Sequence, residues 1–124
     1  MEALNIEKTS HHPQVGFDAD SGILELTGRS LPEQVLSLYQ PILKWIEEYT
    51  STERKETIFK INLDYINSSS SKYLLEILKR LNDFHKKGNK VTVQWFYEDY
   101  DEDSLESGEE YKELLNLNFE LIQK

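Results

Sequence analysis

Two stretches of the chain alternate apolar and polar residues with the two-residue period of a β-strand. In residues 59–65 the odd positions are Phe, Ile, Leu and Tyr, while Lys60, Asn62 and Asp64 lie between them. Residues 90–97 repeat this alternation, with valine and aromatic residues at the odd positions. Because fully buried parallel strands are continuously apolar, the alternation predicts a sheet with one face on the core and one face in water.

Apolar residues recur every three or four positions in two other stretches, which is typical of a helix that lies on a core. The first stretch covers residues 35–49 and contains Pro41, which predicts a bend because proline removes one backbone hydrogen bond. It follows Ser30 and Glu33, which have the spacing of a capping box, so we expect Ser30 to cap this helix. The second stretch covers residues 74–84.

The order of these elements predicts the fold. Two strand–helix–strand units follow one another, and such units place their strands parallel, with right-handed crossovers. Weaker patterns indicate a leading hairpin, a further strand, a final helix and a last strand, at residues 5–6, 15–17, 23–28, 111–115 and 119–122. We therefore expect one α/β domain over residues 1–124, with a mixed β-sheet and helices mainly on one of its faces.

Four consecutive serines lie between Asn67 and Lys72, at the predicted junction of a strand and a helix. The first turn of a helix leaves backbone N–H groups without partners and carries a partial positive charge, so it favours a hydroxyl acceptor or an anion. One Ser or Asn suffices for capping. The surplus serines are either ordinary surface residues or sites of phosphorylation, which adds about 1.5 to 2 negative charges.

The net charge of −9 argues against a nucleic-acid-binding surface, which requires clustered Lys and Arg. Eight of the acidic residues lie between Glu98 and Glu110, where there is no basic residue. This acidic run has two interpretations: a solvated loop and helix start, or an electrostatic docking strip for a basic partner.

Residues typical of enzymes and metal sites are missing. The absence of Cys excludes disulfides and thiolate chemistry, and no glycine pattern forms a phosphate-binding loop or a serine nucleophile elbow. At about 1.5 Å per helical residue, His85 lies roughly 25 Å from Ser68, too far to activate it. We therefore expect no enzyme activity, no cofactor and no metal. No apolar run approaches the roughly 20 residues of a membrane span, so we expect a cytoplasmic protein.

The segment from Tyr65 through Asn67 and the serines to Lys72, followed by a leucine-rich helix and the strand around Trp95, resembles the SiaC family of bacterial regulatory phosphoproteins. That family is similar to the STAS domains of anti-sigma-factor antagonists. The resemblance implies that the hydroxyl residue directly after Asn67, here Ser68, accepts the phosphate. Alignment with the Asp-Ser-Ser motif of the antagonists favours Ser69 instead. Some family members have Thr where this chain has Ser.

The resemblance also implies a function. The unphosphorylated protein would bind and activate a diguanylate cyclase, an anti-sigma-type Ser/Thr kinase would add the phosphate, and a metal-dependent phosphatase would remove it. The partner-binding face would include Tyr65, Asn67, Ser70 and Lys72 beside the acceptor. The alternative is a small hydrolase or anionic-ligand-binding domain that uses the same helix N-terminus. The sequence does not indicate an oligomeric state.

Overall fold

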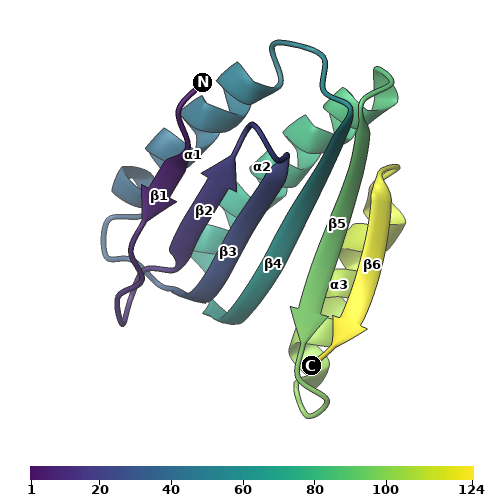
Figure 1. Cartoon of the computed structure of the whole chain (residues 1–124). Helices are drawn as coiled ribbons and strands as arrows, with labels where there is room; N and C mark the ends of the chain where they lie inside the picture. The colour runs from purple at the N-terminus through teal and green to yellow at the C-terminus, as the bar shows by residue number, and fades with distance from the viewer.

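Six strands form one sheet in the order of the chain, β1-β2-β3-β4-β5-β6 (Figure 1). The computed structural model describes residues 1–124. The strands are β1 (Leu4–Ile6), β2 (Gln14–Asp18), β3 (Ile23–Ser30), β4 (Glu56–Ile66), β5 (Lys90–Tyr97) and β6 (Asn118–Gln123), and the helices are α1 (Val35–Tyr49), α2 (Ser68–Lys86) and α3 (Glu102–Leu114).

The sheet is mixed. Strands β1, β2 and β3 pair antiparallel, whereas β3, β4, β5 and β6 pair parallel, and each parallel connection passes through one helix. The carboxyl ends of β3 to β6 therefore meet at one edge of the sheet, the lower edge in Figure 1. The predicted leading hairpin, parallel neighbours and last strand are confirmed, as is the expected α/β fold with a mixed sheet.

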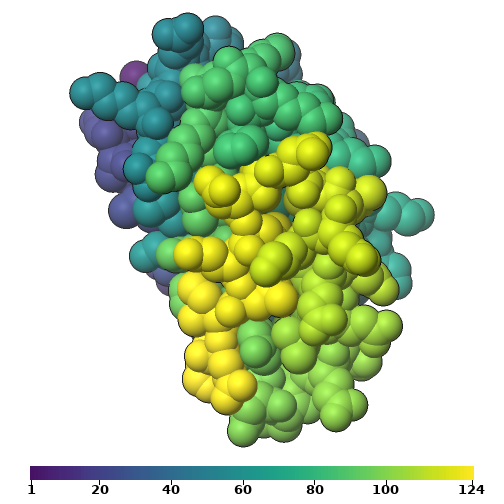
Figure 2. All heavy atoms as spheres, turned by 90° about the vertical axis from the view of Figure 1, so that its right-hand side faces the viewer, coloured from purple at the N-terminus to yellow at the C-terminus, as the bar shows by residue number.

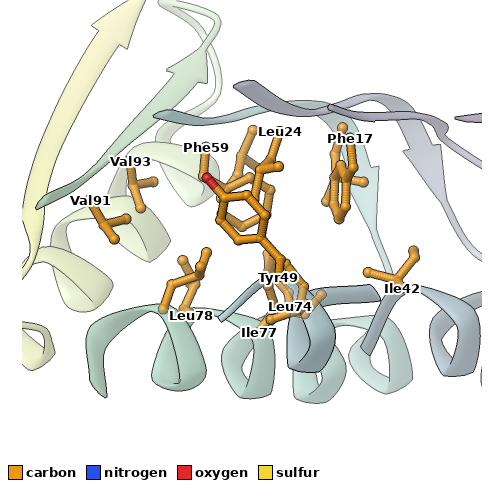
Figure 3. Packing of buried hydrophobic residues seen from close by; sticks show 14 of the residues in the cluster. Phe17, Leu24, Ile42, Tyr49, Phe59, Leu74, Ile77, Leu78, Val91 and Val93 are labelled. Atoms are coloured by element: carbon orange, nitrogen blue, oxygen red, sulfur yellow. The ribbon is translucent and has the colours of Figure 1, made fainter. Parts of the chain in front are cut away.

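All three helices lie on the same face of the sheet (Figure 1). Figure 3 shows the core between the two layers, where Phe59 of the sheet faces Tyr49 of α1 and Ile77 of α2. In β4 the buried and less buried positions alternate, so Lys60 and Asp64 lie on the face without helices. The core therefore sits on one face of the sheet, as the alternating pattern predicted.

The capping box predicted at Ser30 is wrong. Ser30 is the last residue of β3 and is fully buried, while α1 begins at Val35, after Gln34, whose side chain makes no capping hydrogen bond. The reason is the sheet: Ser30 pairs with Ile66, and its carbonyl accepts a 2.9 Å hydrogen bond from Asn67 N, so its backbone stays extended. Strand pairing outweighs the local capping signal.

Helix α3 packs unusually close to β5 and β6, and its glycine permits this approach. A Cβ atom on Gly108 would lie 2.7 Å from both Trp95 Cδ1 and Leu121 Cδ2. The indole of Trp95 also donates a 3.0 Å hydrogen bond to the Ser104 carbonyl of α3. Figure 2 shows α3 and β6 side by side on this edge of the molecule. Most of the acidic run belongs to α3.

None of the three helices has the combination of length and apolar composition that crossing a lipid bilayer requires.

Candidate functional site

The first turn of α2 begins directly after β4, at the carboxyl edge of the sheet. Asn67 is the capping residue: its backbone is extended, and its Oδ1 accepts a 2.9 Å hydrogen bond from Ser70 N. Its own N–H donates to the Ser30 carbonyl at the end of β3. Asn67 thus fixes the start of α2 against the sheet, and capping requires none of the four serines.

The four serine hydroxyls have different surroundings. Ser69 Oγ donates to Asn67 Oδ1 at 3.2 Å, and Ser71 Oγ donates to the Asn67 carbonyl at 3.1 Å. Ser70 is fully buried and accepts a 3.0 Å hydrogen bond from Ser30 Oγ. Ser68 is exposed, and its hydroxyl has no hydrogen-bond partner in the protein. Only Ser68 therefore presents a free hydroxyl to solvent.

Ser70 was expected on the partner-binding face, and its burial corrects that expectation. Its side chain lies in a buried hydroxyl cluster with Ser30 and Tyr39, in which Ser30 Oγ lies 2.6 Å from the Tyr39 hydroxyl. Burial raises the pKa of Tyr39 above its usual value, while the neighbouring hydroxyls of Ser30 and Ser70 lower it in part. A hydroxyl at this depth does not reach a docking protein. The Ser70 side chain instead links α2 to β3 and, through Ser30, to α1.

The other predicted binding residues do lie near Ser68. Tyr65, at the carboxyl end of β4, is 50% exposed, and the Arg29 guanidinium lies over its ring at 5.9 Å from the centroid. Lys72 is exposed and forms no ion pair. It follows Ser68 by four residues, so the two side chains are neighbours on the helix surface. The structure thus brings Tyr65, Asn67, Ser68 and Lys72 to one corner of the molecule.

A pocket of about 300 Å³ adjoins this corner, between α2 and α3 at the carboxyl ends of β4 and β5. Sequence reasoning missed it, since its residues come from four elements and its aromatic members look like ordinary core residues. Its lining combines apolar, hydroxyl and acidic side chains: Ile61, Leu63, Asp64, Tyr65, Ile66, Ser71, Trp95, Phe96, Asp101, Asp103, Ser104, Ser107 and Tyr111.

The histidines and carboxylates do not gather into a metal site. His85 is half-buried, and its Nδ1 accepts a 3.1 Å hydrogen bond from Val91 N. It therefore stabilises the connection between α2 and β5. No group of three or more His, Asp or Glu side chains is arranged to hold a metal ion.

The sequence also matches a known protein family. A sequence model of the SiaC family of regulatory phosphoproteins matches residues 6–124. The chain belongs to the SiaC family. This is a family of regulatory phosphoproteins and not of enzymes, in agreement with the expectation from the sequence. The family match covers the first turn of α2, the pocket and all of the helices.

Relatives in Pseudomonas aeruginosa are similar in sequence and structure. An uncharacterized protein of strain UCBPP-PA14 is 30% identical over 113 residues, covering 91% of this chain and 90% of that protein. The structure of SiaC has a TM-score of 0.92 at 27% identity and covers 100% of both chains. A crystal structure of the diguanylate cyclase SiaD in complex with its activator SiaC matches with a TM-score of 0.93 at 28% identity, covering 98% of this chain and 99% of the matched chain.

Proposed function

We propose that this chain is a phosphorylation-gated regulatory protein whose unphosphorylated form binds and activates a diguanylate cyclase. Its membership of the SiaC family and the complex of SiaC with SiaD support a cyclase as the partner. The observation that carries the switch is the surroundings of Ser68, the one hydroxyl of the serine run that is both exposed and free of hydrogen bonds.

Ser68 is the acceptor in this proposal, and Ser69 is the weaker candidate. A kinase must approach the hydroxyl and place it in line with the γ-phosphate of ATP. The Ser68 hydroxyl is free to do so, whereas that of Ser69 first has to leave Asn67 Oδ1, 3.2 Å away. Ser70 is excluded by burial and Ser71 is held by the Asn67 carbonyl.

The phosphate alters docking and leaves the fold intact. At the first helical residue it lies near the positive end of the α2 dipole and one turn from the Lys72 ammonium, so the helix tolerates its negative charge. A partner seated on the free hydroxyl would instead meet three oxygens and their hydration shell. Phosphorylation therefore prevents binding of the cyclase.

Two further enzymes complete the cycle. An anti-sigma-type Ser/Thr kinase adds the phosphate to Ser68, and a metal-dependent phosphatase removes it. Both act on an exposed residue at the end of a helix, which requires no unfolding of α2. The alternative of a hydrolase gains no support, because Ser68 Oγ has no hydrogen-bonded base to activate it.

The test of the acceptor compares Ser68→Ala with Ser69→Ala. Each variant is incubated with ATP and the kinase encoded by the same organism, and the incorporated phosphate is located by mass spectrometry. We expect Ser69→Ala to be labelled like the wild type and Ser68→Ala to remain unlabelled. Full labelling of Ser68→Ala would contradict the assignment.

The test of the switch measures binding to the diguanylate cyclase of the same organism and the rate at which the cyclase forms cyclic di-GMP. Ser68→Ala keeps binding and activation, because it removes only an unpaired hydroxyl. Ser68→Asp weakens both, because it places a carboxylate in the docking surface, while Ser69→Asp serves as the matched charge control. Equal activation by wild type and Ser68→Asp would argue against gating at this residue.

A further inference from the structure

The pocket between α2 and α3 has an apolar floor. Ile61 of β4 and Trp95 of β5 are paired neighbours in the sheet and face the helices, and Tyr111 of α3 contacts the Trp95 ring edge-on at 5.5 Å between centroids. Leu63 adds a further aliphatic side chain. The volume, about 300 Å³, is at the lower end of the range for small-ligand sites, roughly 300 to 1,000 Å³. It is suited to a large apolar side chain.

The charged side chains that line this pocket are all acidic. Asp64, Asp101 and Asp103 line it, and no Lys, Arg or His does. Asp101 Oδ1 accepts a 3.0 Å hydrogen bond from Ser104 N. The Asp64 carboxylate lies 3.4 Å from Lys124 Nζ, whereas Asp103 forms no ion pair. Asp64 is therefore balanced by Lys124, whereas Asp101 and Asp103 make the α3 side of the entrance negative.

We propose that this pocket receives an aliphatic or aromatic side chain from a protein partner whose neighbouring residues include Lys or Arg. The apolar floor binds the anchoring side chain, and the carboxylates bind the cations beside it. A nucleic acid or an anionic metabolite would be repelled. A second copy of this chain would bring a second net charge of −9 to the same surface. The inference rests on the proposed function in one respect, that the partner docks at the start of α2.

The position of Ser71 connects the pocket with the phosphorylation site. Ser71 lines the pocket and lies three residues after Ser68, so the two are neighbours on the surface of α2. A partner whose anchor fills the pocket thus also covers the Ser68 hydroxyl. Its cations lie on the α3 side, beside Asp101 and Asp103, and a phosphate on the α2 side obstructs the anchor by its bulk and bound water.

The first experiment measures binding of the full chain to the diguanylate cyclase of the same organism. Ser107→Phe fills the pocket from α3, and Asp103→Lys reverses a charge at its rim. Glu113→Lys makes the same charge change on α3, outside the pocket, and is the matched control. We expect both pocket variants to bind about tenfold more weakly and Glu113→Lys to bind like wild type. If wild type and both pocket variants bind equally, the pocket assignment fails while the proposed function stands.

The second experiment does not use the cyclase. It therefore tests the pocket even if the wild-type chain does not bind the cyclase and the proposed function is wrong. The probe is a synthetic helical peptide with one Leu flanked by Lys residues, titrated into the full chain. NMR follows the two indole N–H signals: Trp95, which donates to Ser104 O beside the pocket, and Trp45, which donates to Glu2 O and serves as the reference.

We expect a saturable shift of the Trp95 signal with this peptide, its loss in Ser107→Phe and its retention in Glu113→Lys. Two control peptides, one with Ala in place of Leu and one with Glu in place of the Lys residues, should not shift the Trp95 indole signal. No shift, or an equal shift with the Glu peptide, would overturn the proposal. So would a dimer, seen by light scattering, that Ser107→Phe dissociates, because a second copy would then occupy the pocket.

Discussion

The hydroxyl of Ser30 donates a 3.0 Å hydrogen bond to the hydroxyl of Ser70, forty positions later in the chain. Ser30 ends β3 and Ser70 lies in the first turn of α2, and both side chains are fully buried. The Tyr39 hydroxyl of α1 lies 2.6 Å from Ser30 Oγ. Three elements are thus joined directly beneath the exposed Ser68, which holds the start of α2 in place.

Ser30→Ala should destabilise the protein more than Ser70→Ala. Removing the central hydroxyl leaves two buried hydroxyls without their partner and should cost about 1 to 3 kcal/mol, whereas Ser70→Ala leaves the contact between Ser30 and Tyr39 and should cost about 1 kcal/mol. Urea unfolding followed by tryptophan fluorescence measures both. The reverse order would show that Ser30 is not the centre of the cluster.

Gly108→Ala should lower the free energy of unfolding by about 1 to 3 kcal/mol. The added methyl group would lie 2.7 Å from Trp95 and Leu121, so α3 has to move away from β5 and β6. Gly16→Ala is the control, because a Cβ atom there meets no heavy atom within 4 Å. Thermal unfolding by circular dichroism compares the two variants, and equal midpoints would contradict the close approach of α3.

Asn67→Ala should cost about 1 kcal/mol, the usual effect of losing a helix cap. Asn67→Asp keeps an oxygen that can accept from Ser70 N and places a negative charge at the helix N-terminus, so it should be as stable as wild type. Urea unfolding separates the two variants. A loss in Asn67→Asp as large as in Asn67→Ala would mean that the acceptor oxygen is not the stabilising group.

Periodicity predicted β4 and α2, because the alternation in β4 and the helical spacing in α2 result from one-sided burial, which the residues themselves determine. It misplaced the last helix, which was expected at residues 111–115 but spans Glu102–Leu114, because the acidic first turns of α3 carry no apolar stripe. The capping box at Ser30 failed because strand pairing with Ile66, a contact far along the chain, outweighed a local signal. The serine run predicted the location of the candidate site, but the structure was needed to distinguish Ser68 from Ser70. The pocket could not be predicted, since its residues come from four separate elements.

Alkaline pH should destabilise the protein through two tyrosines. Burial raises the pKa of Tyr39, and burial together with the Glu110 charge raises the pKa of Tyr111. An unfolded tyrosine ionises near pH 10, so above about pH 10 the unfolded chain releases protons that the folded chain retains. The stabilisation is complete below that pH and is lost as the pH rises through the folded-state pKa values.

The free energy of unfolding should therefore fall by about 1.4 kcal/mol per pH unit for each retained proton. Urea unfolding at a series of pH values from about 8 to 11 measures this slope. Tyr39→Phe and Tyr111→Phe should each make it less steep, because each removes one retained proton. Tyr100→Phe is the matched control, because that side chain is 79% exposed. A slope in Tyr39→Phe as steep as in wild type would show that its buried hydroxyl does not resist ionisation.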